Sequence, residues 1–98
     1  MEPMPEFLVE LYVPKADRAP VAVWAERLGG AAAELTADGR PVRLLRSILV
    51  PEDETCFLLV EADSTETVQE AATRAALEFE RVAEATVDLV TTPGREQS

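Results

Sequence analysis

The chain has 98 residues, of which 47% are hydrophobic and 29% charged, fractions that suit one soluble globular domain. Nineteen acidic residues against nine basic ones give a net charge of −10, which argues against binding DNA, RNA or anionic membranes through clustered Lys and Arg. The absence of histidine removes the commonest general base and the commonest transition-metal ligand, and no apolar run approaches the roughly 20 residues of a transmembrane helix.

The first third of the chain predicts a strand followed by a helix. We expect a loose arm over residues 1–5 and a strand over Glu6–Val13, which is rich in β-branched, aromatic and apolar side chains. Pro20 suits the first turn of a helix, and Asp38-Gly39 is a helix stop signal. Between them, apolar residues recur at helical spacing: Trp24, Leu28, Ala31, Ala32 and Leu35. The pair Gly29-Gly30 lies inside this stretch, and we expect a kink there or a close approach to the sheet.

The middle of the chain predicts a hairpin. Apolar and β-branched residues extend over Val42–Val50 and again over Thr55–Ala62. The short segment 51–54 between them contains a proline and three acidic residues, so the two strands are expected to pair in antiparallel fashion.

The last third predicts a second helix and a final strand. Asp63 and Glu66 have the three-residue spacing of a capping box, so we expect Asp63 to cap the helix. The apolar stripe of this helix extends over Val68–Phe79. The alternating residues Glu84–Val90 predict the fourth strand, and residues 92–98 form a polar, flexible tail.

This order of elements, strand-helix-strand-strand-helix-strand, is that of the ferredoxin-like α+β fold. We therefore expect one domain over residues 6–91, in which a four-stranded antiparallel sheet carries both helices on one face.

Side chains alternate along a strand, so the pattern also predicts which residues face the helices. The expected helix-facing set comprises Phe7, Val9, Leu11 and Val13, then Val42, Leu44, Ile48 and Val50, then Cys56, Leu58, Val60 and Ala62, and finally Ala85, Val87 and Leu89. Arg46 falls among the apolar positions of the second strand, and we expect an edge position or a β-bulge there.

The opposite face is rich in large side chains that neither helix would cover. They are Leu8, Tyr12, Leu45, Leu49, Phe57 and Leu59. A soluble monomer rarely exposes an apolar patch larger than a few hundred Å². We therefore expect a second copy of the chain to cover this face through a two-fold axis.

Polar side chains lie among these apolar ones. Glu10, Tyr12, Arg43 and Glu61 are the candidate ligand-pocket residues, and Asp88 is predicted on the same face. Because a buried charge is costly unless paired, we expect Arg43 to pair with Glu10 or Glu61. Two interpretations stay open: an ion-paired set that fixes the register of a dimer, or a small-ligand pocket with convergent polar groups.

No motif points to a catalytic centre, a metal or a cofactor. The consecutive carboxylates Glu52-Asp53-Glu54 lack the ligand spacing of a calcium loop and fit a solvated hairpin tip. Cys56 lies in an apolar strand with no histidine to activate it, which fits a buried structural thiol. One cysteine and no histidine exclude a conventional zinc site within one chain.

The predicted hairpin, over Val42–Phe57 with Glu61-Ala62, carries a family resemblance together with the segments Phe7–Glu10, Val68–Leu77 and Arg81–Ala85. These segments resemble a family of small actinobacterial ferredoxin-like proteins of unknown function. A relative in the broader family is described as a nickel-binding, dimeric ferredoxin-like protein, so the resemblance implies this fold and a dimer. Histidine is the expected nickel ligand and this chain has none, so the resemblance does not carry a nickel site across.

The sequence thus favours a homodimer that is a non-catalytic module, either structural or small-ligand-binding. One alternative is a cofactor-free enzyme of the dimeric α+β barrel type, such as a monooxygenase or isomerase; another is a divalent-metal-binding protein like the nickel-binding relative. A pocket bearing Tyr12 with Glu10 or Glu61 would favour an enzyme. The acidic, proline-broken N-terminus does not resemble a signal peptide, and with a single cysteine we expect a reducing cytoplasm.

Overall fold

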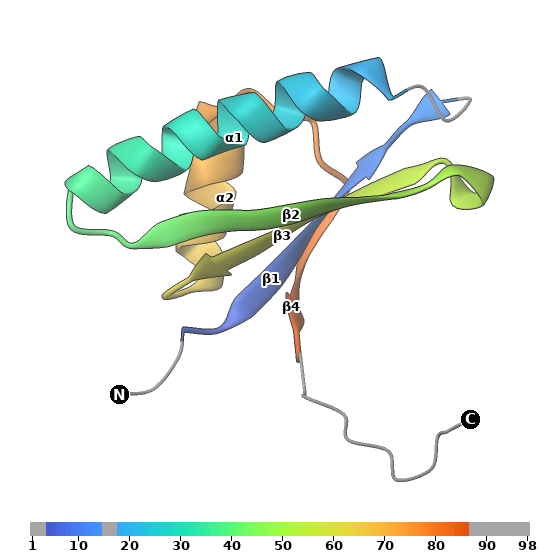
Figure 1. Ribbon diagram of the computed structural model, residues 1–98. Coiled ribbons are helices and arrows are strands. Elements are labelled where there is room, and N and C mark those ends of the chain that lie inside the picture. The colour runs from blue at the N-terminus through green and yellow to red at the C-terminus, as the bar shows by residue number, and fades with distance from the viewer. Residues whose placement is uncertain (1–3, 15–17, 87–98) are drawn as a thin grey trace, which may run out of the picture.

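The computed structural model describes residues 4–14 and 18–86 and has the expected order of elements (Figure 1). The elements are β1 Glu6–Tyr12, α1 Ala19–Ala37, β2 Val42–Val50, η2 Pro51–Asp53 (a short 3-10 turn), β3 Thr55–Ala62, α2 Thr65–Arg74 and β4 Arg81–Ala85. The four strands form one antiparallel sheet in the order β2-β3-β1-β4. The ferredoxin-like fold is therefore confirmed for this part of the chain.

The hydrophobic core lies between the sheet and the two helices, which both cover the same face (Figure 1). The central strands bury every second side chain, as predicted: Phe7, Val9 and Leu11 of β1, and Cys56, Leu58, Val60 and Ala62 of β3. The helices contribute Leu28 and Leu35 of α1 and Val68, Ala71 and Ala72 of α2. The other face of the sheet, called the open face below, is not covered by any described element.

A β-bulge changes the faces of β2. The register with β3 shifts between Leu44 and Arg46, so Leu45 is the extra residue on the bulged strand. Arg46 then lies opposite Leu59 on the open face, whereas Leu49 lies opposite Cys56 and packs against the core. The expected bulge is confirmed. The predicted faces beyond it are wrong for Arg46, Ile48, Leu49 and Val50, because one inserted residue reverses the alternation.

The glycine pair in α1 neither breaks the helix nor brings it close to the sheet. α1 is continuous, and a Cβ added at Gly29 or Gly30 would meet no other atom within 4 Å. The expected close approach to the sheet is therefore wrong, and the helix continues through the pair without a break. The helix ends at the predicted stop signal, where Gly39 has φ of 91°. Thr36 fastens this end to β2, because its Oγ1 bonds the backbone N–H and C=O of Val42 at 3.1 and 2.9 Å.

The cap of α2 lies one residue later than the sequence predicts. Ser64 is the N-cap, and its Oγ accepts the backbone N–H of Thr67 at 3.3 Å. Asp63 lies before the cap and accepts a hydrogen bond from the Ser64 hydroxyl at 3.4 Å. The predicted capping box on Asp63 is wrong. Asp and Ser can both cap a helix, and the three-residue spacing of Asp63 and Glu66 favoured Asp63 over its neighbour Ser64.

The end of α2 comes earlier than its apolar periodicity predicts. The helix ends at Arg74, and Ala76 follows in the left-handed region with φ of 60°. The N–H groups of Ala76 and Leu77 donate back to carbonyls of the last turn, each at 3.0 Å, which is a Schellman ending. Leu77 is buried and Phe79 packs against the core, although neither is helical. The apolar spacing therefore continues past the helix because the connection to β4 crosses the same core.

β4 begins at Arg81 rather than at the predicted Glu84. The predicted positions Val87, Asp88 and Leu89 lie outside the described residues. Within β4, Val82 lies opposite Val9 and packs against the core, whereas Ala85 lies opposite Glu6 on the open face. The prediction that Ala85 faces the helices is therefore wrong, because the strand pairs in the other alternation. No helix of the described chain is long and apolar enough to cross a membrane.

Candidate functional site on the open sheet face

The open face has an apolar centre. Strand register and alternation place on this face Glu6, Leu8, Glu10 and Tyr12 of β1, Arg43, Arg46, Ile48 and Val50 of β2, Thr55, Phe57, Leu59 and Glu61 of β3, and Arg81, Ala83 and Ala85 of β4. Leu8 lies directly opposite Leu59, and Phe57 lies opposite Ile48, which is 39% exposed. These four large side chains form one contiguous patch, and both helices lie on the far side of the sheet (Figure 1).

Two ion pairs flank this apolar centre. The Arg43 guanidinium lies 3.4 Å from a Glu61 carboxylate oxygen, across the β2–β3 pair. Arg81 Nε donates to Glu10 Oε1 at 2.9 Å, across the β1–β4 pair. In both pairs the arginine is exposed and the glutamate half-buried, so each arginine covers a carboxylate that the sheet partly shields. Exposed pairs of this kind contribute little stability, about 0–1 kcal/mol each.

Over residues 4–14 and 18–86, the open face is electrically neutral on a strongly acidic chain. Its arginines, Arg43, Arg46 and Arg81, equal in number its glutamates, Glu6, Glu10 and Glu61. The whole net charge of −10 therefore lies on the rest of the chain. Two copies of the chain therefore repel each other least when they approach through this neutral, apolar surface.

The four predicted pocket residues share the open face but do not converge on one point. Arg43 and Glu61 form one of the predicted pairs, whereas Glu10 pairs with Arg81, which sequence reasoning did not select. Arg81 was missed because its strand was expected to begin three residues later. Tyr12 lies at the end of β1, is 56% exposed, and lines a separate cavity.

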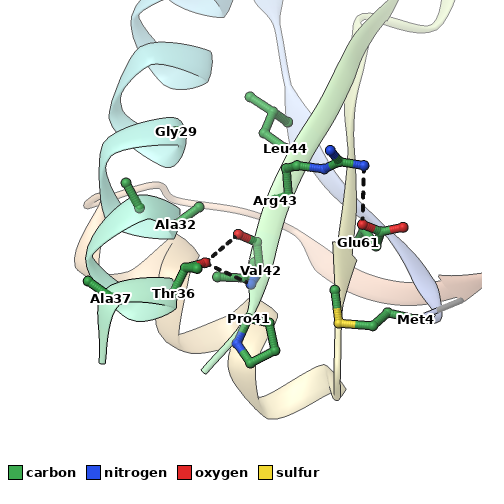
Figure 2. Close-up of a pocket in the computed structure, with 11 residues that line it drawn as sticks. Met4, Gly29, Ala32, Thr36, Ala37, Pro41, Val42, Arg43, Leu44 and Glu61 are labelled. Atoms are coloured by element: carbon green, nitrogen blue, oxygen red, sulfur yellow. Dashed lines mark hydrogen bonds and ion pairs between the residues drawn. The ribbon is translucent and has the colours of Figure 1, made fainter. Parts of the chain in front are cut away.

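A groove of about 890 Å³ runs between α1 and β2 (Figure 2). It is lined by Met4, Gly29, Ala32, Ala33, Thr36, Ala37, Pro41, Val42, Arg43, Leu44 and Glu61. The α1 side is formed by small side chains, which leave space that larger ones would fill. Figure 2 shows the Arg43–Glu61 pair on the side of β2 away from α1. The pair therefore belongs both to the groove and to the open face. The sequence signal for the groove was the run of small residues in α1.

The remaining candidate groups do not form a reactive centre. Burial raises the pKa of the Cys56 thiol, with a smaller opposing effect from the backbone hydrogen bond of Ile48. The thiol is therefore protonated at neutral pH, and it is fully buried. Among the described residues, no group of three or more His, Cys, Asp and Glu side chains could hold a metal ion.

No protein-family model matches the chain, and no curated protein is similar to it in sequence. A solved structure that it resembles is that of SCO4226 from Streptomyces coelicolor A3(2), with a TM-score of 0.62. The two sequences are 18% identical, and the match covers 86% of this chain and 99% of the other. At this identity the likeness shows the fold alone. The neighbour is an actinobacterial protein, in line with the sequence resemblance.

Proposed function

We propose that the chain is a non-catalytic module that acts as a homodimer, joined through the open faces of two sheets. The observation that carries this proposal is the neutral, apolar open face on a chain of net charge −10. Complete burial of a large apolar side chain is worth roughly 1.5–3 kcal/mol, and the centre offers four that are half-exposed. Association costs several kcal/mol of lost freedom, which such a centre can offset.

The groove between α1 and β2 is the candidate ligand site of this module. Its volume of about 890 Å³ lies in the usual range for small-molecule sites, and its lining is mainly apolar. We infer a largely apolar small molecule as its ligand. Because Arg43 and Glu61 line the groove and lie on the open face, an occupied groove would change the surroundings of a pair at the dimer interface.

A binding role is favoured over an enzymatic one by the pairing of the carboxylates. The enzyme alternative calls for a pocket in which Tyr12 meets Glu10 or Glu61 as acid or base, and neither the groove nor the cavity beside Tyr12 contains that combination. Glu61 is paired with Arg43, Glu10 is paired with Arg81, and the buried Cys56 is protonated at neutral pH. A reducing cytoplasm suits this free thiol.

The dimer is tested by a pair of matched charge insertions. Ile48 on the open face and Val23 on α1 are both exposed apolar residues, at 39% and 44%. Ile48→Glu should give folded monomers by sedimentation and circular dichroism, because the new carboxylate would be buried without a partner. Val23→Glu, the control, should remain a dimer. A monomeric wild-type chain, or equal behaviour of the two variants, contradicts the proposal.

The face assignment is tested by two neighbours on β3. Leu59 lies on the open face and Leu58 is completely buried under the helices. Leu59→Glu should fold and dissociate, whereas Leu58→Glu should abolish folding.

The groove is tested by filling it, independently of the dimer. Gly29 lines the groove and Gly30 does not, and an added Cβ meets nothing within 4 Å at either position. Gly29→Leu should reduce binding of the neutral dye Nile red, whereas Gly30→Leu should not. Equal binding by both variants would remove the groove from the proposal and leave the dimer standing.

A further inference from the structure

A second cavity of about 450 Å³ lies away from the groove, beside the end of β1. It is lined by Tyr12, Trp24, Ala76, Glu78, Phe79 and Glu80. These residues come from β1, from α1 and from the connection between α2 and β4, which descends below α1 to the end of β1 in Figure 1. Three segments that are distant in sequence therefore build this cavity.

Aromatic side chains are concentrated in this cavity. The chain has one tyrosine, one tryptophan and three phenylalanines, and the cavity takes the tyrosine, the tryptophan and one phenylalanine. Trp24 and Phe79 are half-buried and pack against the core, so their rings are held in place. Tyr12 is 56% exposed and adds a ring that is not needed for the core. The cavity thus presents three aromatic rings, each with a π face that can attract a cation.

Two carboxylates complete the lining. Glu78 and Glu80 are exposed, and neither forms an ion pair or a side-chain hydrogen bond with the rest of the described chain. This distinguishes them from Glu10 and Glu61, which are both paired with arginines. The negative charge of the cavity is therefore uncompensated by the described residues, and the net charge of −10 adds to it at longer range.

The connection between α2 and β4, which carries Glu78, Phe79 and Glu80, is held in place at both ends. Leu77 is buried, and its N–H donates to the carbonyl of Ala72 at 3.0 Å. At the other end, the N–H of Glu80 donates to the carbonyl of Glu10 on β1 at 2.7 Å. Phe79 lies between these two anchors and packs against the core, so its ring and the backbone that carries the two glutamates are positioned before any ligand binds.

We propose that this cavity binds an organic cation of the quaternary ammonium or methylated amine class. Aromatic rings attract such a cation through their faces, and the nearby carboxylates favour its charge. A small inorganic cation would gain less, because it needs oxygen ligands on several sides and the cavity offers only two carboxylates. The site is distinct from the groove and from both ion pairs, since it shares no residue with them, and Tyr12, at the end of β1, is the lining residue that also lies on the open face.

The test uses tetramethylammonium and the fluorescence of Trp24, the single tryptophan. Titration with tetramethylammonium chloride should give a saturable change in emission. Sodium chloride at equal ionic strength should not, and neither should tert-butanol, a neutral molecule of similar size. An equal response to the neutral molecule, or no saturable response to the cation, overturns the proposal.

Matched variants locate the binding. Tyr12→Leu should weaken tetramethylammonium binding about two- to fivefold, the effect of one exposed cation–π contact, whereas Tyr12→Phe should retain it. Glu80→Gln should weaken binding more than Glu66→Gln, which removes the same charge from the exposed first turn of α2, at the opposite end of β3 from Thr55, the partner of Tyr12. Equal weakening by both glutamate variants would show general attraction to an acidic protein and overturn the assigned site.

Discussion

The buried thiol of Cys56 makes the stability of the protein depend on pH. Its pKa is raised above its ordinary value, mainly by burial. A group whose pKa is higher in the folded state stabilises that state below the unfolded pKa and loses this contribution as pH rises toward the folded pKa. Urea unfolding from pH 7 to 10 should therefore show stability falling above about pH 8.5, the pKa of an unfolded cysteine.

Cys56→Ala provides the control for this titration. The variant should be less stable at pH 7, because it loses a buried sulfur, but its stability should fall less between pH 8.5 and 10. If wild type and variant lose the same free energy over that interval, the decline comes from other groups and the prediction fails.

Ala76 carries a backbone strain that a single substitution relieves. It occupies the left-handed region, with φ of 60°, where a Cβ costs roughly 1–2 kcal/mol. Glycine is the usual residue at this position of a Schellman ending. Ala76→Gly should therefore raise the free energy of unfolding by roughly 0.5–1 kcal/mol, after the entropy lost by glycine on folding.

The neighbouring residue supplies the matched control. Ala75 is buried and has right-handed φ of −80°. Ala75→Gly should destabilise the protein by about 1 kcal/mol, because it removes a buried methyl group and adds chain freedom. Thermal unfolding of the two variants should show shifts of opposite sign.

At the scale of elements, α2 depends on the hydroxyl of Ser64. This hydroxyl accepts the N–H of Thr67, so Ser64→Ala should cost about 1 kcal/mol of stability. Asp63→Ala removes an exposed side chain outside the cap and should cost less than about 0.5 kcal/mol. Chemical denaturation measures the stability of both variants. A larger loss of stability in Asp63→Ala than in Ser64→Ala would show that Asp63 is the cap, as the sequence predicted.

The order and type of all six main elements could be predicted from the sequence, because each has a clear periodicity. The register of the strands could not. The bulge at Leu45 inserts a residue with no Gly or Pro to mark it, and only the awkward position of Arg46 indicated it. The early end of α2 could not be predicted either, because Leu77 and Phe79 continue the helical spacing of apolar residues although they lie in the connection after the helix.

The candidate site could be predicted only in part from the sequence. The pairing of Arg43 with Glu61, one of the two partners expected for Arg43, follows from their opposite places on the hairpin before the bulge, where the predicted alternation holds. The pairing of Glu10 with Arg81 depends on the true start of β4, which the sequence did not mark. The small residues of α1 are a sequence signal for the groove, but the width of the groove depends on the distance between α1 and the sheet. The second cavity depends on the path of the connection before β4, which no local pattern in the sequence contains.

For the molecule as a whole, the acidic composition predicts weak and unselective metal binding. The chain has no histidine, its one cysteine is buried, and the described residues contain no group of metal-binding side chains. Titration calorimetry with nickel should show no stoichiometric site, and calcium should give a similar weak response. A one-to-one complex with nickel at micromolar or tighter affinity would contradict this prediction.

The distribution of charge predicts how the proposed dimer responds to salt. Each chain carries a net charge of −10, all of it outside the neutral open face, so two approaching copies repel through their remaining surfaces. Salt shortens the screening length from about 10 Å at 0.1 M to about 3 Å at 1 M and so weakens this repulsion. The apolar centre does not depend on opposite charges. The dissociation constant measured by sedimentation should therefore fall several-fold as sodium chloride is raised.

A charge change on the helical layer separates this repulsion from a general effect of salt on apolar contacts. Glu26 is exposed on α1, on the side of the sheet away from the open face, and Glu26→Lys lowers the net negative charge by two. The variant should dimerise more tightly than wild type at low salt and respond less to added salt. If the wild-type dimer instead weakens in salt, then ion pairs between the two copies hold it together, and the apolar centre of the open face is not what joins them.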